Sequence, residues 1–122
     1  MAKAINKSSS DGFETRRMTH TADVGVGDIV VVNGCVAVAF KGASADTSTI
    51  YIVDAEIIAF PKKAGIAVKS GDKMYWDPTA GTVTNVKADG LVLCGLAHLE
   101  AAATDATVDI ELMDCAPLVG AA

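Results

Sequence analysis

Two residues of the sequence lie at a spacing that could support acid–base chemistry. His98 and Glu100 are two positions apart, and in a β-strand residues at that spacing share one face. A histidine titrates near neutral pH, so the pair could form a small catalytic site if a turn aspartate lay beside it. The same spacing arises freely on the solvent face of any strand, and the sequence favours that interpretation.

Other chemical signals in the chain are weaker. Cys35, Cys94 and Cys115 are far apart and form no CxxC pair, so we expect three buried thiols in a reducing cytoplasm and no metal or redox centre. Residues 25–30 begin like a dinucleotide fingerprint, but the last glycine is absent and the segment opens a strand rather than a helix. The sequence predicts no cofactor, no metal ion and no enzymatic activity.

The aspartates and the one aromatic doublet have structural interpretations. Most aspartates stand next to Gly, Ala or Pro, where a carboxylate accepts hydrogen bonds from backbone N–H groups of its own turn. Tyr75 and Trp76 are adjacent, so alternation along a strand places one ring in the core and the other at the surface or at an interface. A pair of rings lining an open groove would instead indicate a glycan-binding module.

Short strands separated by turns must position these residues. The dipeptide Asn33-Gly34 predicts a tight hairpin turn, Pro61 closes a strand because it lacks an N–H, and Gly95 indicates a bulge. Alternation predicts that Val108 and Ile110 point inward. The expected strands are 29–32, 35–40, 49–54, 56–60, 73–77, 82–86, 91–99 and 107–113.

This spacing predicts an all-β fold, a small antiparallel β-barrel or sandwich of about seven to eight strands. The chain has 122 residues, which is enough for one domain. We expect a single β-domain at 25–122, preceded by an extended arm at 1–24. The arm carries four basic and three acidic side chains, whereas the remainder carries six lysines and twelve acids.

Charge and hydropathy exclude some partners. The net charge is −5 and the isoelectric point is about 4.8, which argues against nucleic acid. The longest uncharged apolar stretch, 29–40, is broken by Asn33-Gly34 and is shorter than the roughly 20 residues that span a bilayer. No secretory signal is recognised at the N-terminus, so we expect the protein to be made and kept in the cytoplasm.

Several segments in order resemble a known family. They are 27–34 (GDIVVVNG), 56–62 (EIIAFPK), 70–77 (SGDKMYWD), 81–84 (GTVT) and 93–97 (LCGLA). This ordered set resembles the small capsid cement, or head decoration, proteins of tailed bacteriophages, from about residue 25 to residue 113. The arm is longer and more polar than the pattern of that family.

The resemblance implies a structural virion protein that binds the outer surface of the capsid and stabilises the expanded shell. It implies the major capsid protein as partner and a homo-oligomer, with a trimer favoured. We expect the arm to contact the capsid or a neighbouring copy. The predicted contact residues are Phe13, Arg16, Arg17, Met18 and Trp76. The alternative is another virion or tail β-module that binds a receptor or glycan, and a small β-barrel enzyme ranks last.

Overall fold

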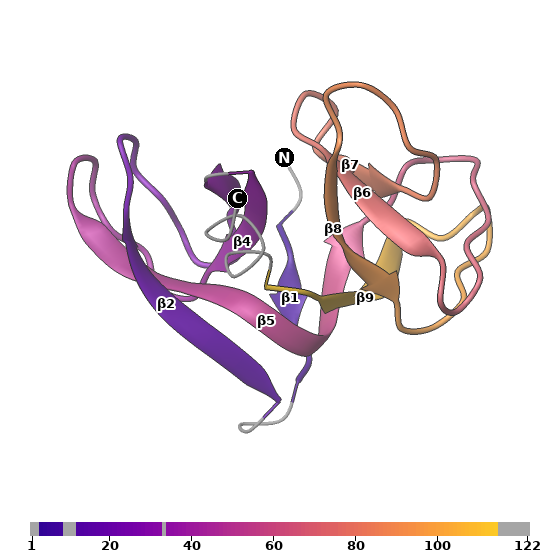
Figure 1. The fold of residues 1–122 in the computed structure, drawn as a ribbon, viewed down its shortest axis with the longest axis horizontal. Helices are drawn as coiled ribbons and strands as arrows, with labels where there is room; N and C mark the ends of the chain where they lie inside the picture. Colours follow the sequence, from indigo (N-terminus) through magenta and orange to yellow (C-terminus); the bar gives the residue numbers. More distant parts are fainter. Residues whose placement is uncertain (1–2, 9–11, 33, 115–122) are drawn as a thin grey trace.

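The computed structural model describes residues 3–8, 12–32 and 34–114, and every helix or strand element in this part of the chain is a β-strand (Figure 1). The all-β class predicted from the sequence is confirmed. The strands are β1 (Ile5–Asn6), β2 (Phe13–Thr19), β3 (Ile29–Val32), β4 (Cys35–Ala39), β5 (Ser48–Pro61), β6 (Lys73–Asp77), β7 (Thr82–Thr84), β8 (Val92–Ala97) and β9 (Thr107–Leu112).

The 14-residue strand β5 organises the sheet. Tyr51 pairs with β2 on one edge and with β4 on the other, and Ala59 pairs with β1 and β9 in the same way. Ala55 pairs with β2 and β9, so β1 and β2 share one edge while β4 and β9 share the opposite edge. The two expected strands 49–54 and 56–60 are therefore one strand, with a register shift against β9 between Ala55 and Ile58.

β5 curves, so the strands that continue the sheet from its β4 and β9 edge separate into two halves (Figure 1). One half contains β4 and β3, and the other runs β9-β8-β6-β7. All the named strand pairs are antiparallel. The result is a curled sheet that forms a half-barrel.

Alternation along the strands builds two hydrophobic clusters. Val36 and Val38 of β4 enter the main core between the two halves, while Ala37 and Ala39 join a smaller cluster on the other face. In the main core the rings of Phe60 and Trp76 meet edge to face, with centroids 6.2 Å apart. Burial on both faces makes β4 one of the most enclosed strands.

The segment expected as an extended arm lies along β5 of the same chain. β2 pairs with β5 from Phe13↔Ala55 to Thr19↔Ser48, so its backbone groups are satisfied although most of its side chains are exposed. The pairing explains why a polar segment with few buried groups becomes a strand. Separation of residues 1–24 from the β-domain stays a prediction.

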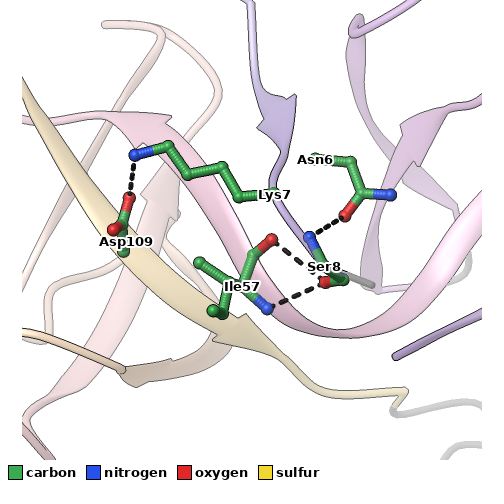
Figure 2. Close-up of polar contacts among 5 residues, drawn as sticks. All are labelled: Asn6, Lys7, Ser8, Ile57 and Asp109. Carbon is green, nitrogen blue, oxygen red and sulfur yellow. Dashed lines mark hydrogen bonds and ion pairs between the residues drawn. The ribbon is translucent and has the colours of Figure 1, made fainter. Parts of the chain in front are cut away.

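β1 is fixed to β5 by side-chain hydrogen bonds (Figure 2). The Ser8 hydroxyl donates to the carbonyl oxygen of Ile57 at 3.1 Å and accepts from the Ile57 N–H at 3.0 Å. The Asn6 side-chain oxygen accepts from the Ser8 N–H, and Lys7 forms an ion pair with Asp109 of β9 at 3.0 Å. These contacts hold a two-residue strand that backbone pairing alone would anchor weakly.

Three turns share one aspartate geometry. In each, the fourth residue of a four-residue turn is an aspartate. Its N–H donates to the carbonyl oxygen of the first residue, and its carboxylate accepts from the N–H of that same first residue. These aspartates are Asp28, Asp72 and Asp105. Asp77 instead accepts from the N–H groups of the two residues that lie two and three positions after it. The predicted turn role is confirmed for these four residues.

Gly95 occupies the predicted bulge in β8. Its partner strand β6 shifts register there, because Met74 pairs with Gly95 and Tyr75 pairs with Leu93. A Cβ atom at position 95 would overlap the carbonyl oxygen of Glu111 on β9. A glycine is therefore required for the close approach of two backbones.

Lys62 follows β5 and is 4% exposed. Its ammonium group donates to the carbonyl oxygens of Ile66 at 2.7 Å, Lys63 at 2.9 Å and Ala103 at 3.4 Å. A lysine has three donors, and all three are used. Lys62 thus joins the loop after β5 to the loop before β9.

Replacing Lys62 by methionine should reduce the free energy of unfolding by about 1–3 kcal/mol, because three partly buried carbonyl groups would lose their donor. Urea unfolding monitored by tryptophan fluorescence measures the change. The control is Lys63→Met, at an exposed neighbouring position, which should alter stability by less than about 0.5 kcal/mol. Equal losses in both variants would contradict the role assigned to Lys62.

Candidate functional site

The predicted contact residues fall into two groups. Phe13, Arg16, Arg17 and Met18 all lie on β2, which pairs with β5 and with no second strand among the described residues. Trp76 lies on β6 in the main core and is 2% exposed. The structure brings the four β2 residues together and separates Trp76 from them.

The two apolar residues of β2 pack inside the chain. Phe13 packs against the main core, and its ring centroid lies 5.4 Å from that of Phe40. Met18 packs against the smaller cluster on the opposite face. Both are half-buried, so each already fills an internal apolar site. Their contact with a partner stays a prediction.

Arg16 has its ionic partner within the chain. Its guanidinium donates to both carboxylate oxygens of Asp114, at 2.7 and 3.3 Å. This hydrogen bonding raises the pKa of Arg16 above its ordinary value. The pair joins β2 to the segment after β9.

Arg17 lies on the other face of β2. Successive residues of a strand point to opposite faces, and Arg17 donates to the hydroxyl of Ser48 at 3.2 Å. Within the described part of the chain no carboxylate forms an ion pair with it. Arg17 is therefore a basic group at the sheet edge whose partner among the described residues is a neutral hydroxyl.

His20 forms hydrogen bonds that the sequence did not predict. His20 Nε2 lies 2.8 Å from the carbonyl oxygen of Ser44, and Nδ1 lies 3.0 Å from the hydroxyl of Tyr51. A carbonyl only accepts, so Nε2 donates to Ser44, and in the neutral ring Nδ1 then accepts from the Tyr51 hydroxyl. Tyr51 is fully buried, and this burial, with a smaller effect of the Asp28 charge, raises its pKa.

The His20–Tyr51 pair adjoins a cavity of about 390 Å³ lined in part by the valines of β3. Both ring nitrogens are engaged, so the histidine connects the end of β2 with the loop before β5. No simple sequence motif predicts this contact, because residues 20, 44 and 51 meet only through the pairing of β2 with β5. We assign the pair a positioning role in the fold.

The other candidate for acid–base chemistry is solvent-exposed. His98 and Glu100 are both exposed, but β8 ends at Ala97, so they do not lie on the strand face that the sequence predicted. Their region follows β8, and the N–H of His98 donates to the carbonyl of Asp109. Among residues 3–8, 12–32 and 34–114, no three or more His, Cys, Asp or Glu side chains group as metal ligands. In the same residues, no helix is long and apolar enough to cross a membrane.

The cysteines differ from one another. Cys94 is buried, its thiol lies 3.3 Å from the carbonyl oxygen of Met74, and burial raises its pKa to about 12. Cys35 is disulfide-bonded, which corrects the expectation of three free thiols. Cys115 lies outside the described residues. The free thiol of Cys94 is shielded from solvent by the same core that contains Trp76.

Alkaline pH should destabilise the protein through Cys94. An exposed thiol in the unfolded chain ionises near pH 8.5, whereas the folded thiol stays protonated until about pH 12. The contribution of Cys94 to the free energy of unfolding is therefore fully present below pH 8.5 and decreases as the pH rises toward 12, by up to about 2 kcal/mol at pH 10.

Urea unfolding at pH 7.5 and pH 10, for the wild type and Cys94→Ala, measures this contribution. The wild type should lose more stability between the two pH values than the variant, which has no thiol at this position. Equal losses would show that the thiol ionises as readily in the folded protein as in the unfolded chain.

A larger cavity, of about 500 Å³, lies between β1 and β4. Val38 and Ile52 of the main core line it, and the exposed side chains of Ile5 and Val26 lie at its margin. Phe40, which contacts Phe13, also lines it. The described surface thus presents an apolar groove near β2.

Comparisons with known proteins give one family. The family model described as phage cement protein matches residues 10–112, which is most of the chain. No curated protein and no solved structure matches the chain. The matched range includes β2, the curled sheet and β9.

Proposed function

Because the chain belongs to the phage cement protein family, we propose that it binds the outer surface of the phage capsid and stabilises the expanded shell. The family match over residues 10–112 is the observation that carries this proposal. The partner is the major capsid protein, and the role is structural rather than enzymatic. The protein is made in the host cytoplasm and then added to the virion.

Mass action explains how such binding stabilises a shell. A ligand that binds only one state of its partner stabilises that state by RT ln(1 + L/Kd), where L is the free concentration of the ligand. A cement protein with preference for the expanded shell therefore opposes its disassembly at every occupied site. Assembly as a homo-oligomer, with a trimer favoured, would add avidity. Once one subunit is bound, the others bind at a high effective concentration.

The glycan- or receptor-binding alternative required both aromatic side chains of the doublet in an open groove. Tyr75 is half-buried and Trp76 is 2% exposed in the core. No ring of Trp76 is available for stacking on a sugar. No observation favours this alternative, so we do not propose it.

Contact between residues 1–24 and the capsid remains part of the proposal. Removing residues 2–23 would delete both strands that pair with one edge of β5, and it would also remove Ala4 and Phe13 from the main core. Such a truncation would expose an unpaired strand edge. Single substitutions are therefore the appropriate test of this segment.

Purified protein should co-sediment saturably with expanded shells of the phage that encodes it, and not with shells before expansion. Quantifying bound protein against free protein gives the dissociation constant and the number of copies per shell. Bovine serum albumin at the same concentration controls for trapping in the pellet. Absence of binding to expanded shells, or equal binding to both forms, would contradict the proposed function.

A further inference from the structure

The groove between β1 and β4 is an unusual part of the described surface. Its floor contains Val38 and Ile52, which are almost fully buried. At its margin the exposed fraction is 63% for Ile5, 65% for Val26 and 38% for Phe40. Large apolar side chains exposed together around a cavity of about 500 Å³ are typical of an interaction surface.

Charges close to the groove are largely compensated. Lys3 lines the groove and forms an ion pair with Asp28 at 3.2 Å. The Asn6 side-chain oxygen accepts from the N–H of Ser8. The groove itself is therefore suited to uncharged, apolar side chains.

One basic group that forms no ion pair with the described residues lies beside this surface. Arg17 is the cross-strand partner of Ile50 on one edge of β5, and the N–H of Phe40 donates to the carbonyl oxygen of Ile50 on the other edge. Arg17 and Phe40 thus lie on either side of Ile50. Their backbones are two strand spacings apart, which is about 10 Å.

The register places Arg17 on the same face as the floor of the groove. Ile50 and Ile52 are two residues apart and pair with Arg17 and Thr15 without a register shift between them, so these four side chains share a face. Arg16 lies on the opposite face, where Asp114 neutralises it. Of the two adjacent arginines, Arg17 is the one available to a partner.

We propose that this groove is the capsid-binding surface and that it takes an extended, apolar segment of the shell protein with a carboxylate that pairs with Arg17. The inference rests on the proposed function, since the shell protein is the partner. The proposed function favours the shell over a second copy as the occupant, and Arg17, which forms no ion pair within the described residues, favours a contact that carries a carboxylate. Apolar side chains supply the buried area, and the ion pair sets the orientation.

Val26→Asp tests the groove, and Val86→Asp is its matched control. The two valines are 65% and 62% exposed, and only Val26 lines the groove. Val26→Asp should weaken binding to expanded shells at least tenfold, because the new carboxylate would lose water in an apolar contact. Val86→Asp should bind as the wild type does.

Arg17→Ala and Arg16→Ala form the second matched pair. Loss of an ion pair at the contact should weaken shell binding about tenfold or more in Arg17→Ala. Arg16→Ala should bind like the wild type, because its partner Asp114 is internal. Thermal unfolding of all four variants verifies that each is folded.

The outcomes separate the two proposals. If the wild type binds expanded shells and Val26→Asp and Arg17→Ala bind equally well, the groove is not the contact, although the capsid function stands. If the wild type does not bind, both proposals are wrong. If sedimentation velocity shows that Val26→Asp dissociates an oligomer while shell binding per copy is unchanged, the groove holds a second copy, and the shell segment is overturned as its occupant.

Discussion

The pairing of β5 on both of its edges is the constraint on which the rest of the structure depends. Four strands take their register from it, two on each edge. A straight strand with β4 and β9 on one edge would place them end to end in a single layer. The irregular pairing between Ala55 and Ile58 accompanies the curvature of β5, so the two halves face each other and enclose one core.

This curvature has a consequence for the open side of the half-barrel. The main core is closed by β4 and β8 across from each other and by the large side chains of Phe60 and Trp76. Between β1 and β4 no strand closes the sheet within the described chain. A groove with apolar walls remains there, and the two residues of β1 cover only part of it.

The structure of β1 and β2 depends on backbone pairing with β5 much more than on side-chain burial. β2 contributes only two partly buried apolar residues, and its ion pair with Asp114 involves an arginine whose side chain is 42% exposed. Exposed ion pairs contribute little to stability. The edge segment is thus a region of low local stability attached to a well-packed core, and such segments are the first to open in native proteins.

Local patterns in the sequence predicted much of the sheet. The hairpin of β3 and β4, strand β6, the bulge at Gly95 and the inward side chains of β9 all follow from alternation and turn residues. β2 was missed because Glu14, Thr15, Arg16 and Arg17 show no apolar alternation. It is a strand only because the edge of β5 offers it backbone partners, and that is information from elsewhere in the chain.

The candidate contact residues show the same limit. Adjacent arginines look equivalent in the sequence, and only the register with β5 separates them. Arg16 shares a face with Tyr51 and is paired with an internal carboxylate. Arg17 shares a face with Ile50 and with Ile52, which lines the groove. Trp76 was predicted at a contact, yet it fills the core, because alternation allows either member of the doublet to point inward.

Lys62 and His20 show why polar residues are hardest to place from sequence. A lysine after a strand-ending proline has the appearance of a solvated loop residue, but three carbonyl groups surround it. The carbonyl groups of Lys63 and Ile66 lie in the loop after β5, and that of Ala103 lies in the loop before β9. The two loops therefore share one cation, which joins the segment after β5 to the segment before β9.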